Sequence, residues 1–76
     1  YFRLGDFPHA VEELEKAAKM LPSDGTVQEH LGDALRALGR IPEARTAYER
    51  ALQLGDGDTA QVRRKLDEVE QGEPRQ

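Results

Sequence analysis

The sequence predicts an all-α protein, a short right-handed superhelical stack of antiparallel helix pairs that ends in a C-terminal capping helix. The first observation is an internal repeat. Residues 1–24 match residues 35–58 at an offset of 34 positions, with identity at Leu4/Leu38, Gly5/Gly39, Pro8/Pro42, Ala10/Ala44, Glu15/Glu49, Ala17/Ala51 and Asp24/Asp58. A fixed period of this length is typical of helical repeat arrays. The second observation is the helical spacing of apolar residues within each segment.

The first full helix should begin near Pro8 and run to about Leu21. Proline suits a first helical turn, where its missing N–H group is tolerated. Ser23 or Asp24 can then cap the next helix. We expect the inward face of this first helix to consist of Ala10, Val11, Leu14, Ala17, Ala18 and Leu21.

A helical hairpin should follow. The apolar residues of its two helices fall on one face each: Val27, Leu31, Ala34, Leu35 and Leu38 on the first, and Ala44, Ala47, Tyr48, Ala51, Leu52 and Leu54 on the second. Gly39 supplies the left-handed residue that ends the first helix, and Pro42 fits the first turn of the second. A connection this short forces the two helices to run antiparallel.

The last helix should span residues 58–71, and residues 72–76 should form a frayed tail. Asp58 followed by Gln61 has the spacing of a capping box. The inward face carries only Val62, Leu66 and Val69. This thin apolar stripe predicts a helix that caps the stack and presents charges to solvent.

Composition narrows the possible functions. A chain of 76 residues forms one small unit, whose core rarely contributes more than about 3–5 kcal/mol. The net charge of −4 does not suit a nucleic-acid-binding surface, which is normally basic. No apolar run approaches the roughly 18 residues of a membrane span, so we expect no membrane insertion. The absence of cysteine leaves the compartment open, either the cytoplasm or the bacterial cell envelope.

The repeated residues resemble the tetratricopeptide repeat (TPR), whose pattern is W-x2-L-G-x2-Y-x8-A-x3-F-x2-A-x4-P. The positions in register with it are Leu31, Gly32, Leu35, Ala44, Tyr48 and Ala51. Two positions depart from the pattern, because Gln28 stands where Trp is favoured and Asp56 replaces Pro. The resemblance covers residues 1–58 strongly and residues 59–71 weakly. Gly32 and Ala44 lack bulk where the two helices of a hairpin must approach closely.

The resemblance implies a single TPR-like domain over residues 1–71. Residues 1–24 would be a partial first repeat, residues 25–57 a complete repeat, and residues 58–71 the capping helix. Residues 1–4 match residues 35–38, so we expect the chain to open in the last turn of a helix whose beginning is absent. In the last helix, Lys65-Leu66 stands where Leu-Gly would be. This is similar to the C-terminal end of many bacterial TPR arrays, and we expect a segment of a longer protein.

In TPR proteins the first helix of each repeat lines a concave binding face. The matching residues here are Thr26, Glu29, Asp33 and Arg36, continued on the last helix by Arg63, Asp67 and Glu70. Chaperone-binding members use Lys and Asn at this face to clamp a terminal carboxylate. Glu29 and Asp33 would repel a carboxylate, so we expect a different specificity. A partner segment of basic character and an ordinary solvated surface both remain open.

No residue pattern points to catalysis, a cofactor or a metal. His9 and His30 lie 21 residues apart on different helices, without two-ligand spacing. Asp56, Asp58 and Asp67 suggest a calcium loop, but Gln61 occupies the place that requires glycine. Ser23 is the only serine, and the acidic clusters of Glu12, Glu13 and Glu15 and of Asp67, Glu68 and Glu70 lie on solvated helix faces. We expect the basic run of Arg63, Arg64 and Lys65 to form ion pairs within its own helix, with Asp67, Glu68 and Glu70.

We therefore expect a non-catalytic protein–protein interaction or scaffold module that binds a helix or an extended peptide on its concave face. The alternative is a structural role, as the C-terminal cap and self-association segment of a larger TPR protein. With the opening helix almost absent, the stripe of Phe7, Val11, Leu14 and Ala18 should lose part of its cover. Such a stripe favours a homodimer or an exchange of helices between chains.

Overall fold

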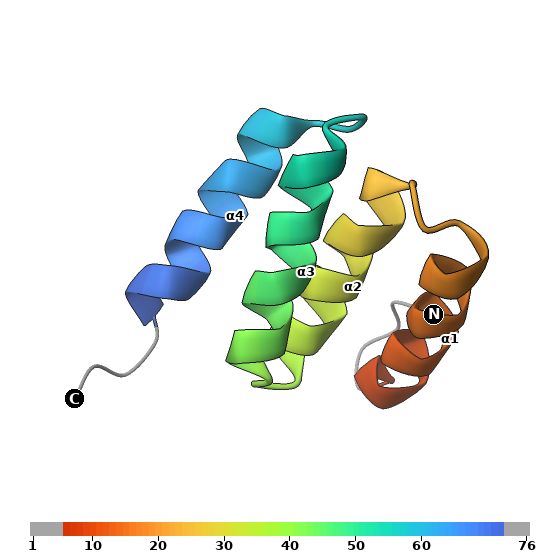
Figure 1. The fold of residues 1–76 in the computed structure, drawn as a ribbon. Helices are drawn as coiled ribbons and strands as arrows, with labels where there is room; N and C mark the ends of the chain where they lie inside the picture. Colours follow the sequence, from red (N-terminus) through yellow and green to blue (C-terminus); the bar gives the residue numbers. More distant parts are fainter. Residues whose placement is uncertain (1–5, 73–76) are drawn as a thin grey trace.

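The computed structural model describes residues 6–72 and confirms the all-α fold. Four helices follow one another: α1 (Phe7–Met20), α2 (Gly25–Ala37), α3 (Ile41–Leu54) and α4 (Thr59–Gly72). Each helix packs against the next one in the chain, and Figure 1 shows them side by side in sequence order. Within the described residues, no helix is long and apolar enough to cross a membrane. The helix end expected at residues 1–4 lies outside this range, as does the tail expected at residues 72–76 apart from Gly72, which ends α4.

The ends of α2 are fixed by two motifs that the sequence indicates. At its start, the Asp24 carboxylate accepts hydrogen bonds from the backbone N–H groups of Thr26, at 2.9 Å, and Val27, at 3.2 Å. At its end, Gly39 adopts a positive φ of 80°. The Arg40 N–H group then donates to the Leu35 carbonyl at 2.9 Å, which closes a Schellman motif. These motifs place the α2–α3 turn where the sequence predicts it.

The other helix ends follow the same logic. Pro42 lies in the first turn of α3, and Gly55 ends that helix with a φ of 68°. The Asp58 carboxylate accepts a hydrogen bond of 3.0 Å from the Gln61 N–H group at the start of α4. This bond is the N-terminal half of the expected capping box.

The core is a continuous layer of small and medium apolar residues along the stack. Its buried members are Ala10, Val11, Leu31, Ala34, Leu35, Ala44, Ala47, Tyr48, Ala51, Val62, Leu66 and Val69. Tyr48 is the largest fully buried side chain in the described part of the chain. A Cβ atom added at Gly32 would lie 2.6 Å from Tyr48 Cε1. Gly32 therefore makes room for the aromatic ring of the partner helix.

One expected core residue is misplaced. Leu21 was expected on the inward face of the first helix, but it is 52% exposed. It is the C-cap of α1, with φ −128° and ψ 65°, so its backbone has left the helical path. The periodicity of the helix does not apply beyond Met20, and the Leu21 side chain turns toward solvent.

Candidate functional site

The residues expected at the binding face come from α2 and α4, and we call this surface the α2–α4 face. Four of its members are exposed: Thr26, Arg36, Arg63 and Asp67. Asp33 and Glu70 are half-buried, and Glu29 is buried with 9% exposure. The sequence therefore assigns these residues to two helices that share one surface, but it does not predict that the Glu29 side chain is buried.

Lys65 joins the two helices of this face. Its ammonium Nζ on α4 donates a hydrogen bond of 2.8 Å to Glu29 Oε2 and another of 3.0 Å to Asp33 Oδ2, both on α2. Burial alone lowers the pKa of Lys65, but the hydrogen bonds to the two carboxylates outweigh it and leave the pKa above its ordinary value. The two acids of α2 therefore share a cation from the same chain.

Tyr48 completes this network from α3. Its hydroxyl group donates a hydrogen bond of 2.5 Å to Asp33 Oδ1, while Lys65 binds the other carboxylate oxygen. Burial raises the pKa of the Tyr48 phenol, and the hydrogen bond to Asp33 raises it further. Asp33 thus links three helices, because it lies on α2 and contacts side chains from α3 and α4.

A second contact between α2 and α4 lies at the surface. Arg36 Nη1 donates a hydrogen bond of 3.1 Å to Glu68 Oε1, and both side chains are about half exposed. Exposed pairs of this kind typically contribute no more than about 1 kcal/mol. Among residues 6–72, Arg63, Asp67 and Glu70 form no ion pair; Arg63 and Asp67 are exposed, and Glu70 is half-buried.

The sequence model of the tetratricopeptide repeat matches residues 1–59, which is most of the chain. The chain belongs to the tetratricopeptide repeat family. No curated protein and no solved structure matches it. Tetratricopeptide repeats generally mediate protein–protein interaction, and the family is generally a non-catalytic scaffold.

The pairing of Lys65 corrects the sequence interpretation. We expected ion pairs within the last helix, whereas Lys65 binds Glu29 and Asp33 on α2, and Glu68 pairs with Arg36. A signal for this was present in the TPR register. The offset of 34 residues aligns Lys65 with Leu31, midway between the two acids on the neighbouring first helix. A long cationic side chain at that position can reach both carboxylates.

Asp56, which replaces the proline of the TPR pattern, also has a role that the sequence did not reveal. Its Oδ1 atom accepts a hydrogen bond of 2.9 Å from the Gly25 N–H group at the first residue of α2. Asp24 satisfies two further N–H groups of that turn. Two carboxylates therefore cap one helix N-terminus, which favours negative charge.

On α1, His9, Glu12 and Glu13 offer three possible metal-ligand atoms within 4.8 Å of one another. Sequence reasoning compared only the two histidines and missed this grouping. Both ring nitrogens face carboxylates instead: Nδ1 lies 3.7 Å from Asp6 Oδ2, and Nε2 lies 3.7 Å from Glu13 Oε2. Each of these contacts lies within about one turn of a single helix, at the surface.

Proposed function

We propose that the chain is a non-catalytic interaction module whose α2–α4 face receives a helix or an extended peptide of a protein partner. The observation that supports this most strongly is the bridge from Lys65 to Glu29 and Asp33. Two helices joined by side chains that are largely withdrawn from solvent form a surface that loses little conformational freedom on binding. The exposed charges around this bridge are then available to a partner.

The bridge also changes the expected partner chemistry. Glu29 and Asp33 suggested a basic segment when considered alone, but Lys65 offsets one of their two negative charges. The members without an ion pair in the described chain are one base, Arg63, and two acids, the exposed Asp67 and the half-buried Glu70. We therefore propose a partner segment that carries both charges rather than one that is uniformly basic.

Affinity capture with the 76-residue chain tests this proposal when two matched triple variants are compared. The first replaces the unpaired charges of α4: Arg63→Ala, Asp67→Ala and Glu70→Ala. The control replaces exposed charges of α1 and α3: Glu12→Ala, Lys16→Ala and Glu49→Ala. Each set removes one base and two acids, and surface changes of this kind usually alter stability by no more than about 0.5 kcal/mol each.

Both variants should retain the helical circular dichroism of the parent chain. A partner captured by the parent and by the control variant, but lost by the α4 variant, supports the proposal. Equal capture by both variants, or loss only in the control, would contradict it.

We also propose self-association as a second function, because apolar surface remains at the C-terminal end of α1. Met20 is 79% exposed and Leu21 is 52% exposed. Of the stripe that we expected to lose part of its cover, Val11 is buried and Phe7, Leu14 and Ala18 are half-buried. Sedimentation equilibrium should show a dimer that Met20→Lys dissociates, and a monomer at high micromolar concentration would contradict this proposal.

A further inference from the structure

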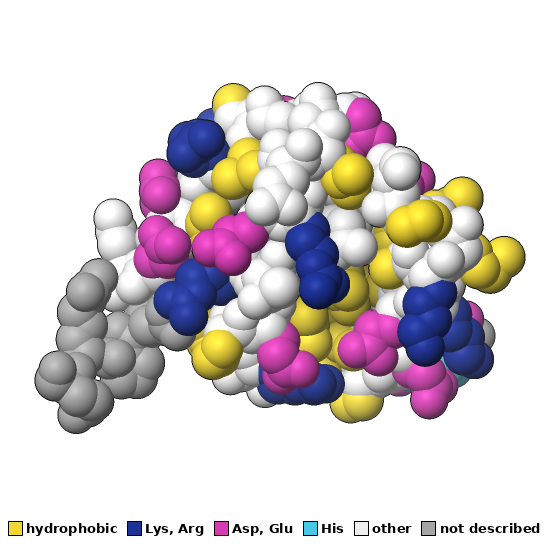
Figure 2. Space-filling view, in the orientation of Figure 1, with side chains coloured by type: hydrophobic (Ala, Val, Ile, Leu, Met, Phe, Trp, Pro, Cys, Tyr) yellow, Lys and Arg dark blue, Asp and Glu magenta, His cyan; other side chains and the backbone are white. Residues whose placement is uncertain are grey.

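A groove lies between α1 and α3, away from the α2–α4 face. It consists of two adjoining hollows of about 530 Å³ and 350 Å³, which share the lining residues Glu15, Leu31 and Arg50. Figure 2 shows hydrophobic surface at the bottom of this hollow, with basic and acidic side chains around its rim. Both volumes lie within the range of about 300–1,000 Å³ that is usual for ligand sites.

Two residues that line the groove depart from the family pattern. At its floor, Gln28 and Leu35 stand where the TPR pattern has Trp and Tyr. Both replacements are smaller than the aromatic side chains of the pattern, which adds to the space between α1 and α3.

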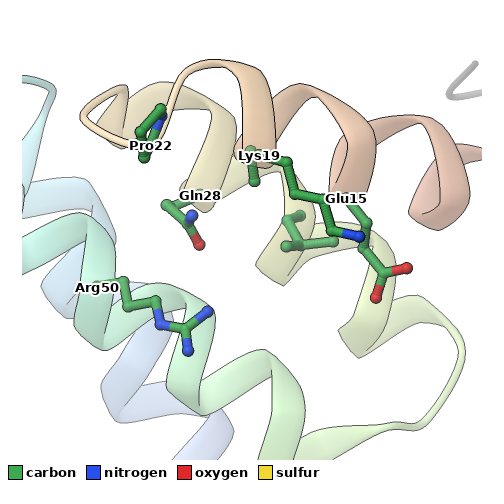
Figure 3. Close-up of a pocket in the computed structure, with 7 residues that line it drawn as sticks. Glu15, Lys19, Pro22, Gln28 and Arg50 are labelled. Atoms are coloured by element: carbon green, nitrogen blue, oxygen red, sulfur yellow. The ribbon is translucent and has the colours of Figure 1, made fainter.

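Gln28 places an unused polar atom in this space. Its side chain is 5% exposed, and in the described part of the chain its Oε1 atom accepts no hydrogen bond. Figure 3 shows the amide directed into the space between Arg50 of α3 and Lys19 of α1. A buried acceptor without a donor is unfavourable, and a bound group that supplies an N–H donor would satisfy it.

The charged side chains that line the larger hollow indicate which kind of ligand it can bind. Arg50 and Lys19 line the larger hollow, and neither forms an ion pair among residues 6–72. Glu15 is the single acid of that hollow, and Glu43 in the smaller hollow is already bound to Arg40. The larger hollow therefore has an excess of positive charge in a chain of net charge −4.

We propose that this groove binds an extended peptide segment of a protein partner, one with an aromatic side chain next to a carboxylate. The aromatic side chain packs on Leu31 and Ala18, in the space that the two smaller residues leave. A backbone N–H group of the peptide donates to Gln28 Oε1, and the carboxylate pairs with Arg50 and Lys19. This surface is separate from the α2–α4 face, so the chain has two interaction surfaces.

Titration of the isotopically labelled 76-residue chain with defined peptides, followed by nuclear magnetic resonance, tests the proposal. The probe is an acetylated and amidated heptapeptide with Asp-Phe-Asp at its centre. Three relatives each remove one element: Asp-Ala-Asp lacks the aromatic ring, Lys-Phe-Lys reverses the charge, and an N-methylated Phe lacks the backbone donor. The probe should shift the amide signals of α1, α2 and α3 around Gln28 and bind with saturation.

Each relative should bind about tenfold more weakly than the probe, as expected for the loss of one good contact. Gln28→Leu should weaken binding of the probe by about the same factor, and this variant should bind the N-methylated peptide as well as it binds the probe. Gln53→Leu, an exposed control on α3, should change neither result. Gln28→Trp should restore the aromatic of the pattern, fill the groove and abolish binding.

If Gln28→Trp does not fold, the peptide titration of the Gln28→Leu chain is sufficient to test the proposal. Equal affinity for the probe and the Lys-Phe-Lys peptide would overturn the proposal, as would unchanged binding to the Gln28→Leu chain. Shifts confined to the α2–α4 face would also overturn it, without contradicting the function proposed for that face.

Discussion

Replacing Gly32 by alanine tests whether the helix pair depends on the contact between α2 and the Tyr48 ring. The added Cβ atom would lie 2.6 Å from Cε1, 2.8 Å from Cδ1 and 3.0 Å from Cζ of that ring. Favourable carbon–carbon contacts are about 3.5–4.0 Å, so the nearest contact of the methyl group with the ring would be too short by about 1 Å. Tyr48 cannot move aside easily, because it has no exposed surface and its hydroxyl group is bound to Asp33.

The expected cost of Gly32→Ala combines two opposing effects. Alanine in a helix interior is favoured over glycine by about 1 kcal/mol, whereas overpacking a well-filled core costs typically 1–3 kcal/mol or more. We expect the steric effect to exceed the propensity gain and the free energy of unfolding to fall by about 1–2 kcal/mol. Urea denaturation followed by circular dichroism measures this difference.

A control separates the clash from the general effect of replacing a glycine. A Cβ atom at Gly57 would lie 3.6 Å from Thr26 Oγ1, an ordinary contact, so Gly57→Ala should leave the stability nearly unchanged. Tyr48→Leu removes the ring, and in that background Gly32→Ala should be nearly neutral or stabilising. A stable Gly32→Ala chain, or an equal cost with and without the ring, would refute the packing argument.

Three further changes test the polar contacts that α2 makes with the rest of the chain. Lys65→Met keeps most of the side-chain volume but leaves the two acids of α2 without their cation. The free energy of unfolding, measured by urea denaturation, should fall by about 1–3 kcal/mol. An unchanged denaturation midpoint would show that the bridge does not stabilise the fold. Asp56→Ala removes a helix cap and should cost about 0.5–2 kcal/mol, whereas Asp67→Ala, an exposed acid outside any cap, should cost far less. Because the folded state raises the pKa of both Tyr48 and Lys65, each keeps its proton after the unfolded chain has lost it near pH 10. Stability should therefore be constant from neutral pH to about pH 10 and then fall, by up to about 1.4 kcal/mol per pH unit for each group. Tyr48→Phe should make this alkaline loss less steep, and an equal slope in the variant would argue against a raised tyrosine pKa.

The sequence predicts the helices and their packing because these depend on local and periodic features. Gly39, Gly55 and Pro42 mark helix ends through backbone constraints that act at single positions. Small residues at Gly32 and Ala44 recur with the repeat and predict the close approach of two helices. Leu21 is wrongly predicted because its helical periodicity ends one residue earlier, where the backbone changes direction.

The polar contacts were harder to predict because they join residues far apart in the chain. Lys65 reaches carboxylates 32 and 36 positions away, and only the alignment of neighbouring repeats brings these residues level. Asp56 likewise bonds to Gly25, which precedes it by 31 positions. Gln28 is recognisable as a departure from the family pattern, but its burial and its unused acceptor arise from the packing of three helices.

The central claim is that a protein partner binds the face formed by α2 and α4. The most direct test is a nuclear magnetic resonance map of the labelled chain with a captured partner, which compares amide and side-chain signals on both sides of the molecule. We predict the largest shifts at Arg36, Arg63, Asp67 and Glu70, with small shifts at Glu12 and Glu49. Large shifts at those two control residues, with an unchanged α2–α4 face, would contradict the claim.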